Sequence, residues 1–353
     1  MKTLRVGVVG LGSIARNRHL PELEQNPYTE ITAVCDVVPS RSEEIAKAYH
    51  ATAYTEYEEL IEDPRIDAVI VCAANHLHAP VSIAALQAGK HVLCEKPMAT
   101  TLEEADEMIA AQKASGKLLL IAHNQCFVPS HQKARKMIQA GELGKIYSFR
   151  TTFGHGGPEQ WSIDGKNSWF FDKDKAYIGA LGDLGVHKSH LIEFLLDEPI
   201  QEVAAFVDTL AKPYADVDDN AVAVLRTKSG IIGTLTASWS YVAEEDNSTI
   251  IYGEKGVIRL EDSPDYSLVV EYQNGDRSNH SLGAIQTNDA QTQSNSGVVD
   301  AFASCVLHNA SDCPITAEKG RSALAVILAA LDSNSDKKVI SLASEPVEKG
   351  EQA

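Results

Sequence analysis

The chain has 353 residues, of which 44% are hydrophobic and 23% are charged, and its formal net charge is −18. A soluble globular chain of this length buries a large core and is expected to form two domains. The acidity argues against nucleic acid and anionic membranes as partners, because both require a basic face.

The first third of the chain alternates apolar strands with helices. Short, nearly continuous apolar runs predict strands at 4–9, 30–36, 67–73, 90–94 and 117–122. Helices are predicted between them at 13–25, 40–50, 56–61, 79–88 and 101–115. Strands that are apolar along their whole length are typical of a parallel sheet covered on both faces. We therefore predict an α/β protein whose residues 1–122 form a doubly wound Rossmann domain.

The first strand leads into a dinucleotide-binding turn. Gly10, Gly12 and Ala15 match the G-x-G-x-x-A pattern. The first glycine allows the tight turn, the second lets the backbone approach a pyrophosphate, and the small third residue lets the helix pack close to the strand. The helix N-terminus then faces the phosphates, and we expect Ser13 and Ile14 to contact the cofactor as well.

Asp36 ends the second strand at the distance from the glycines at which an acid meets the ribose hydroxyls. A carboxylate accepts hydrogen bonds from both hydroxyls of the adenine ribose and repels a 2′-phosphate, which favours NAD over NADP. Arg41 argues for NADP, but it lies in a Ser-Arg-Ser-Glu-Glu run that is typical of a helix start, with Ser40 or Ser42 as the cap. We predict NAD as the cofactor.

After about residue 122 the pattern changes. A helix is predicted at 130–140, followed by a loop rich in Gly and aromatic residues from 153 to 177 and a helix at 183–196. Between residues 202 and 275, long segments alternate polar and apolar residues, which predicts a largely antiparallel sheet with one exposed face. We predict that residues 123–353 form an α+β domain built on this large, open sheet.

The end of the chain completes this domain. The polar stretch 276–296 predicts a surface loop, and a last helix at 318–333 is expected to pack back. One face of the sheet should cover the local helices, while the other carries Val, Ile, Leu and aromatic residues that a monomer would expose. We therefore expect a homodimer or homotetramer joined through this sheet.

Six local motifs follow one another along the chain. They are Gly10-Leu-Gly12-Ser-Ile-Ala15, Ala74-Asn75-His76-Leu77-His78, Cys94-Glu95-Lys96-Pro97, Gly141-Glu-Leu-Gly144-Lys-Ile, Gly179-Ala-Leu-Gly182-Asp183-Leu-Gly185-Val-His187 and Gly253-Glu-Lys-Gly256. In this order and spacing, essentially the whole chain resembles the Gfo/Idh/MocA family of oxidoreductases. The resemblance implies a Rossmann domain, a C-terminal domain with an open sheet that often mediates oligomerisation, a bound nicotinamide cofactor, and activity on sugars, inositols and related polyols.

The resemblance also implies cofactor contacts outside the glycine turn. The residues concerned follow the third, fourth and fifth strands of the Rossmann domain: Ala73, Asn75, His78, Glu95, Lys96 and Asn124. It further implies a cis peptide bond between Lys96 and Pro97. The chain departs from the family at Cys126, where an arginine is common, and at His190, where an aspartate is frequent; both positions are expected near the pocket.

Three residues are candidates for catalysing the oxidation of a secondary alcohol. Lys96 follows a strand at the carboxyl edge of the sheet, where ligands of doubly wound folds bind. Asp183 and His187 are four residues apart, so that on a helix they share one face. With an ordinary pKa of about 6.5, His187 suits a general base, while Lys96 stabilises the developing alkoxide or, if burial lowers its pKa, is itself the base. Asp183 is expected to orient the substrate or support the lysine.

The same three residues are expected to contact the substrate, together with residues of the aromatic loop. Trp161 and Trp169 can stack on sugar rings or pack in the core, and His155 is a further candidate contact. No metal is expected, since His76, His78, His187 and His190 lack the compact spacing of zinc ligands.

Three functions remain open from the sequence. The leading interpretation is an NAD-dependent dehydrogenase that transfers hydride between a sugar, inositol or polyol and the nicotinamide. The alternatives are a glycosidase that retains NAD and cycles it, and a non-catalytic sensor that binds a dinucleotide. Cys35, Cys72 and Cys94 lie in predicted buried strands and no C-x-x-C pair occurs, so that a reduced, cytoplasmic protein is expected.

Overall fold

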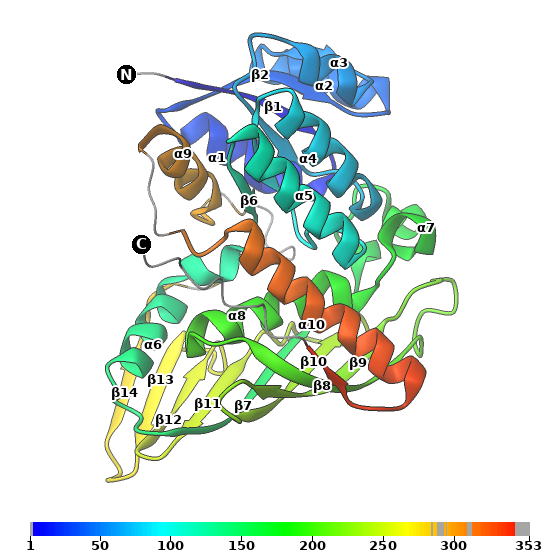
Figure 1. Cartoon of the computed structure of the whole chain (residues 1–353). Helices are drawn as coiled ribbons and strands as arrows, with labels where there is room; N and C mark the ends of the chain where they lie inside the picture. Colours follow the sequence, from blue (N-terminus) through cyan, green and yellow to red (C-terminus); the bar gives the residue numbers. More distant parts are fainter. Residues whose placement is uncertain (1–2, 284, 288–292, 294, 309–312, 343–353) are drawn as a thin grey trace, which may run out of the picture.

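The computed structural model describes residues 3–283, 285–287, 293, 295–308 and 313–342. Two sheets form the frame of the molecule, and Figure 1 shows the Rossmann sheet with its helices above the larger C-terminal sheet. Helix α10 (Ala317–Asp336) lies between them, in contact with α5 (Leu102–Ser115) on one side and β8 (Ile200–Asp208) on the other. The predicted α/β fold is confirmed.

The Rossmann sheet has six parallel strands in the order β3-β2-β1-β4-β5-β6. Its strands are β1 (Leu4–Val9), β2 (Thr29–Cys35), β3 (Thr52–Tyr54), β4 (Ala68–Val71), β5 (His91–Cys94) and β6 (Leu119–Ile121). Five of them were predicted. The edge strand β3 was not, because three residues without a continuous apolar run resemble a loop in the sequence.

The helices of this domain cover both faces of the sheet. They are α1 (Leu20–Gln25), α2 (Pro39–Tyr49), α3 (Tyr57–Glu62), α4 (His78–Gln87) and α5. Thr101 caps α5 by accepting a hydrogen bond from the backbone N–H of Glu104. Helix α2 begins at Pro39 without the predicted serine cap, since proline is already set for the first turn of a helix.

The helix predicted at 13–25 begins as a π-helix over Ala15–His19 and continues as α1. The wider turn leaves Arg18 and His19 buried rather than facing solvent. Both side chains reach Glu95 at the end of β5. A π-helix in this position therefore connects the nucleotide turn to the strand end that precedes Lys96.

The C-terminal sheet has nine strands in the order β14-β13-β12-β11-β7-β10-β9-β8-β15. Its other strands are β7 (Ile146–Gly154), β9 (Asn220–Thr227), β10 (Ile232–Ser238), β11 (Thr249–Gly253), β12 (Gly256–Leu260), β13 (Leu268–Tyr272), β14 (Arg277–His280) and β15 (Ile340–Ser341). Neighbours are antiparallel except β7 and β10, which run parallel. The mostly antiparallel sheet is as predicted.

Several elements after residue 122 were not predicted, among them a strand and a helix. Strand β14 lies inside the stretch 276–296 that was predicted as a loop, and residues 284, 288–292 and 294 of that stretch lie outside the described residues. As an edge strand, β14 pairs with β13 through its backbone and tolerates polar side chains. Helix α9 (Val298–His308) was not predicted at all.

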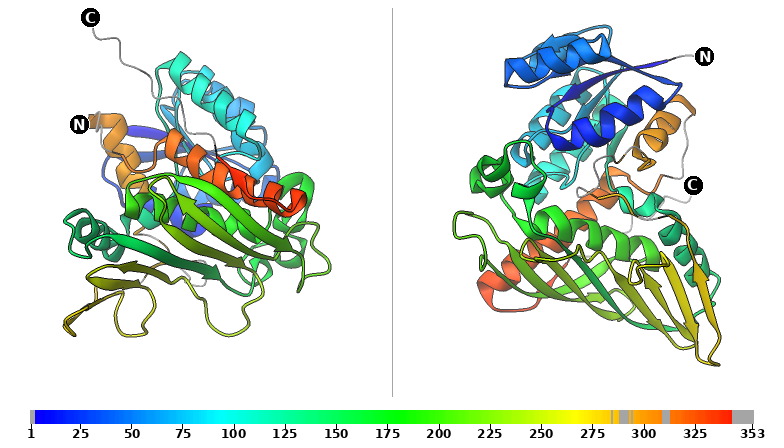
Figure 2. Two further views of the ribbon diagram at one scale, coloured as in Figure 1. Left: turned by 60° about the horizontal axis from the view of Figure 1, so that its bottom comes forward. Right: turned by 180° about the vertical axis from the view of Figure 1, so that it is seen from behind.

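Helix α9 returns to the Rossmann domain, where Figures 1 and 2 show it beside α1. Its buried residues Val298, Val299 and Phe302 belong to the same apolar cluster as Leu20 of α1. The core of the Rossmann domain therefore includes residues far beyond 122, and the boundary between 122 and 123 stays a prediction.

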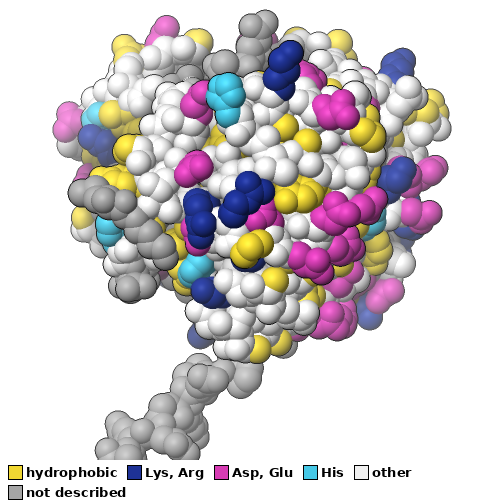
Figure 3. Space-filling model, turned by 90° about the horizontal axis from the view of Figure 1, so that it is seen from above, with side chains coloured by type: hydrophobic (Ala, Val, Ile, Leu, Met, Phe, Trp, Pro, Cys, Tyr) yellow, Lys and Arg dark blue, Asp and Glu magenta, His cyan; other side chains and the backbone are white. Residues whose placement is uncertain are grey.

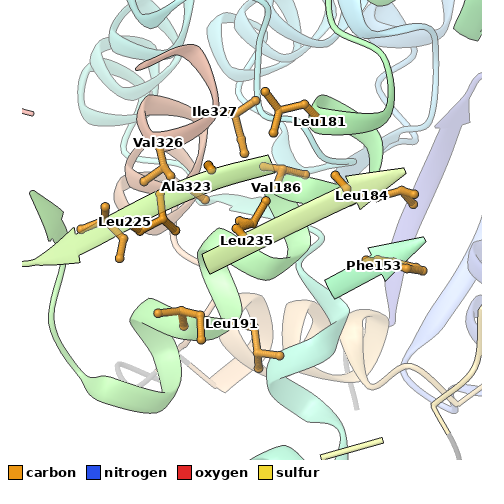
Figure 4. Close-up of a cluster of buried hydrophobic side chains, with 14 of the residues drawn as sticks. Phe153, Leu181, Leu184, Val186, Leu191, Leu225, Leu235, Ala323, Val326 and Ile327 are labelled. Atoms are coloured by element: carbon orange, nitrogen blue, oxygen red, sulfur yellow. The ribbon is translucent and has the colours of Figure 1, made fainter. Parts of the chain in front are cut away.

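The largest apolar cluster lies between the C-terminal sheet and two helices. Figure 4 shows Val186 and Leu191 of α8 (Val186–Leu196) and Val326 of α10 facing Leu225 and Leu235 of the sheet. The remaining helices are α6 (Pro129–Gln139) and the short α7 (Lys173–Ala176). This packing anchors α8, and with it the residues that precede His187, to the C-terminal sheet.

The surface reflects the net charge of −18. On the Rossmann face seen in Figure 3, Asp and Glu side chains gather along one side. Such a surface repels polyanions. Every helix within the described ranges is too short or too polar to cross a bilayer.

Gly10 offers a test of the turn. Its φ is 87°, and a Cβ there would lie 2.6 Å from the backbone N of Ala73. Gly10→Ala is expected to lower the free energy of unfolding by at least about 1–3 kcal/mol, because the left-handed backbone and the clash both oppose a side chain. Gly12→Ala is the control, since a Cβ at Gly12 meets nothing within 4 Å. Thermal unfolding followed by circular dichroism measures both, and equal melting temperatures would contradict this account.

Candidate active site

A cleft opens between the carboxyl edge of the Rossmann sheet and the aromatic loop before α8. Most of the predicted site residues line it, namely Gly12, Ser13, Ile14, Ala73, Asn75, His78, Glu95, Lys96, Asn124, Trp169, Asp183 and His187. Gly10, Asp36 and His155 are not among the lining residues. The structure thus brings together side chains from 12 to 187, and their roles stay predictions.

Lys96 and Asp183 form an ion pair across the cleft. The ammonium Nζ of Lys96 donates to Asp183 Oδ1 at 2.7 Å and to the Asp183 backbone oxygen at 2.8 Å. The indole N–H of Trp239 donates to the other carboxylate oxygen, Oδ2, at 3.1 Å. Both oxygens of the buried carboxylate are therefore held. The Lys96–Pro97 peptide bond is cis, as the resemblance implied.

His187 lies in the first turn of α8, directly after a π-helix over Leu181–Gly185. Asp183 lies in the π-turn and His187 in α8, so that the two are not on one regular helix, and their shared face stays a prediction. Burial and the nearby Lys96 charge lower the pKa of His187 well below 6.5. Its Nδ1 is buried and has no hydrogen-bond partner among the described residues. The imidazole is therefore neutral at neutral pH and can accept a proton.

Glu95 is a buried anion surrounded by basic groups. It accepts a hydrogen bond from His19 Nε2 at 2.7 Å, and Arg18 Nη1 lies 3.6 Å from the same oxygen. Burial alone would raise the pKa of Glu95, but the contacts with His19, Arg18 and Lys96 lower it to about 2. Glu95 also accepts from the backbone N–H of Lys96 at 3.2 Å, so that it fixes the strand end beside the lysine.

The turn after β4 is tied to its neighbours by Asn75 and His78. Asn75 Nδ2 donates to the backbone oxygen of Ala176 at 2.8 Å. The two ring nitrogens of His78 lie 2.7 Å from the Pro97 oxygen and 3.0 Å from the Ala73 oxygen. These contacts set the shape of the cleft between β4 and β5.

The nucleotide turn fits a dinucleotide. Space is open around Gly12, where a Cβ would meet nothing within 4 Å. Asn124 carries a buried Oδ1 without a partner among the described residues. Asp36 accepts from the backbone N–H of Leu11 and of Val38, each at 2.9 Å. Each carboxylate oxygen keeps a lone pair for a ribose hydroxyl, so that the site fits the adenosine end of the cofactor.

An aromatic wall completes the cleft. Trp169 stacks on Phe170 with ring centroids 3.9 Å apart, and Trp161 meets Phe170 edge-on at 5.1 Å. His155 is buried behind this wall, where its Nδ1 accepts from the backbone N–H of Gly157 at 2.9 Å and its ring meets Trp161 edge-on at 6.3 Å. Its assignment as a substrate contact stays a prediction.

The two departures from the family lie one layer behind the cleft. His190 stacks on His123 at 4.2 Å and donates to the Pro314 oxygen at 3.0 Å. Burial lowers the pKa of His190 to about 4, so that the ring is neutral. Cys126 donates to the His123 oxygen at 3.1 Å. In the described part of the chain, no three His, Cys, Asp or Glu side chains are placed to hold a metal.

Several lining residues were not singled out in the sequence. They are Arg18, Gln125, Phe153, Asp164, Phe170 and residues 285–287. The sequence carried one signal for Arg18, which lies among several basic residues in the helix predicted at 13–25. A basic side chain on the buried side of a helix needs a charged partner, and such a partner indicates a polar site. Phe153 lies at the end of β7, and the others come from loops and short 3-10 turns, whose place in space the sequence pattern does not reveal.

Known proteins resemble this chain over most of its length. The profile of an oxidoreductase family with an NAD-binding Rossmann fold, Gfo/Idh/MocA, matches residues 4–123, and the profile of the Gfo/Idh/MocA C-terminal domain matches residues 131–259. Myo-inositol 2-dehydrogenase from Thermotoga maritima is 31% identical over 79% of this chain and 81% of that protein. Levoglucosan dehydrogenase from Pseudarthrobacter phenanthrenivorans is 30% identical over 73% of each chain.

Solved structures also resemble this chain over most of its length. A levoglucosan dehydrogenase in complex with NADH and L-sorbose superposes with a TM-score of 0.84 and 25% identity, over 97% of this chain and all of that one. The two profiles together span the dinucleotide turn, the Lys96 strand end and the helix that carries His187. The chain therefore belongs to the Gfo/Idh/MocA family of oxidoreductases.

Proposed function

We propose that the protein is an NAD-dependent dehydrogenase that oxidises a secondary hydroxyl of a cyclic polyol or sugar, or reduces the matching carbonyl. One observation carries the proposal: a neutral, buried His187 shares a cleft with the Lys96–Asp183 ion pair and the dinucleotide turn. The relatives named for inositol and levoglucosan dehydrogenation support the substrate class.

The bound nicotinamide supplies the acceptor for the hydride that leaves the carbinol carbon. His187 accepts the hydroxyl proton, and the remaining electrons of the O–H bond form the carbonyl. A general base must be unprotonated before it can accept a proton, and burial together with the nearby Lys96 charge keeps His187 in this form at neutral pH.

Lys96 supplies positive charge to the oxygen that becomes negative. An ammonium has three N–H donors, and Asp183 occupies two of them. The third remains for the substrate oxygen, where it stabilises the developing alkoxide. The sequence alone left open whether Lys96 or His187 is the base; the bonds to Asp183 favour the electrostatic role for Lys96. Asp183 acts by orienting the lysine.

The aromatic wall supports a ring-shaped substrate. Trp169 and Phe170 offer flat apolar faces, while Lys96 and His187 supply polar contacts on the same cleft. Such a combination suits the apolar face and the hydroxyl edge of a sugar or inositol ring. A cytoplasmic location is part of the proposal, because Cys35, Cys72, Cys94, Cys126 and Cys305 are buried free thiols.

We also propose a homodimer or homotetramer built on the C-terminal sheet. The face that looks away from α8 and α10 carries Phe206, Val222, Val224 and Ile232 on three adjacent strands. Phe206 is 79% exposed, although a phenylalanine in mid-strand contributes favourably when it is buried. A second copy of the chain would cover this row.

The catalytic assignment predicts the behaviour of two variants. Lys96→Ala and His187→Ala should each lose at least about a hundredfold in kcat while NAD still binds, because neither side chain is needed to hold the pyrophosphate. A panel of inositols, sugars and polyols, scored by NADH absorbance, identifies the substrate for this measurement. Lys175→Ala, an exposed lysine near the cleft, is the control.

Either variant turning over at a near-normal rate would show that the residue has been assigned the wrong role. The same panel separates the alternatives. Hydrolysis of a glycoside without net NADH would indicate an NAD-retaining glycosidase, and dinucleotide binding without any turnover would indicate a sensor.

The cofactor assignment rests on Asp36. The unmodified protein should use NAD with a clearly higher kcat/KM than NADP, since the carboxylate would face a 2′-phosphate. Asp36→Ala and Asp36→Ser should narrow or reverse this preference. Asp36→Asn removes the negative charge but keeps an oxygen that can accept the backbone hydrogen bonds of the turn. It therefore distinguishes the loss of charge repulsion against the 2′-phosphate from a change in the shape of the turn. Comparable kcat/KM values for both cofactors in the unmodified protein would contradict the assignment.

The proposed assembly predicts a dimer or tetramer at micromolar concentration in light scattering. Phe206→Glu with Val224→Glu should shift it towards monomer, because two carboxylates would be desolvated at the contact. Val37→Glu is a matched control, since Val37 is 80% exposed in the Rossmann domain. An unmodified chain that is monomeric would rule the proposal out.

A further inference from the structure

The aromatic loop of the C-terminal domain reaches over the nucleotide turn. Ser13 Oγ donates to the backbone oxygen of Trp161 at 3.1 Å and accepts from the backbone N–H of Ile163 at 3.1 Å. The next residue, Asp164, forms an ion pair with Arg41 of the Rossmann domain. These contacts join residues more than a hundred positions apart in the sequence, and Asp164 itself lines the cleft.

Arg41 lies at the adenosine end of the nucleotide site. It is the third residue of α2, and its backbone N–H donates to the Val38 oxygen at 2.9 Å. The backbone N–H of Val38 in turn donates to the Asp36 carboxylate at 2.9 Å. Arg41 is therefore linked through Val38 to the acid that is predicted to meet the ribose, and an arginine near that acid is what accommodates the 2′-phosphate of NADP.

The guanidinium of Arg41 would by itself favour NADP. A guanidinium binds phosphate through parallel charged hydrogen bonds, which are among the strongest polar contacts in proteins. In this structure its Nη2 is bound to the Asp164 carboxylate, and the pair is only partly exposed, at 26% for Arg41 and 34% for Asp164. Arg16, in the helix after the glycine turn, is likewise bound by a carboxylate, that of Glu44 at 3.0 Å.

We propose that Asp164 is a second determinant of cofactor choice, which acts by occupying Arg41. The inference rests on the proposed function, because it explains how a chain with an arginine beside the ribose site prefers NAD. A 2′-phosphate would have to displace Asp164 from Arg41 and would then leave that carboxylate without its partner next to a new anion. The discrimination thus comes from a loop of the C-terminal domain as well as from Asp36.

Isothermal titration of the intact protein with NAD and with NADP tests this without any need for a substrate. Asp164→Asn and Asp164→Ala should shift the ratio of the two dissociation constants towards NADP by at least about fivefold, as expected when a charged hydrogen-bond donor becomes available to a phosphate. A general loosening of the loop would weaken the binding of both cofactors alike, so that it cancels in the ratio of the two dissociation constants. Asp172→Asn is the control, since Asp172 pairs with Lys175 next to it and not with an arginine.

The Arg41→Ala background decides whether Asp164 acts through Arg41. There, Asp164→Asn should shift the ratio clearly less than in the natural background, because no guanidinium is released and only the repulsion between Asp164 and the phosphate is lost. A shift that persists undiminished in this background overturns the proposal, as does a ratio that Asp164→Asn leaves unchanged in the natural background. If the unmodified protein binds NADP as tightly as NAD, the NAD preference itself fails together with this inference. An NAD preference that no Asp164 variant alters defeats the inference alone.

Discussion

The ion pair between Lys96 and Asp183 is the contact on which the site depends. It joins the end of β5 in the Rossmann domain to the π-turn before α8 in the C-terminal domain. Burying two charges costs more than their attraction returns unless further hydrogen bonds satisfy them. Trp239 and the Asp183 backbone oxygen provide those bonds. Removing one partner would leave the other charge buried and unpaired. The ion pair therefore couples the Rossmann side of the cleft to its C-terminal side.

The same burial determines the charge of the neighbouring groups. Glu95 is held as an anion by Arg18 and His19, while His187 is held neutral by burial and by the Lys96 charge. Both pKa values are therefore lowered, but for different reasons: basic partners keep Glu95 charged, whereas burial keeps His187 uncharged. The arrangement leaves an uncharged imidazole beside paired cations and carboxylates in the cleft that the dinucleotide turn lines.

Two π-helical turns position these groups. The first, Ala15–His19, follows the glycine turn and directs Arg18 and His19 to Glu95. The second, Leu181–Gly185, carries Asp183 to Lys96. Each inserts an extra residue into a helical turn, and such insertions are frequent at functional sites because they re-aim side chains without ending the helix.

The sequence alone determined the features that depend on local pattern. The G-x-G-x-x-A turn, the apolar runs of the parallel sheet and the period-two segments of the larger sheet predicted both folds, because glycine geometry and side-chain periodicity follow from neighbours in the chain. The spacing of Asp183 and His187, and the position of Lys96 at a strand end, indicated the catalytic candidates for the same reason. Helix α9 was not predicted because it is stabilised by packing on the distant α1, and β3 and β14 were not predicted because short edge strands need no continuous apolar run.

Only the tertiary structure decided how these candidates meet. It brought Lys96 to Asp183, placed Trp239 on the same carboxylate, and put His155 behind the aromatic wall. It also paired Asp164 with Arg41, a contact between two residues that nothing in the sequence connects. Contacts between residues this far apart depend on how two domains pack, and packing is a property of the whole core rather than of any local run of residues.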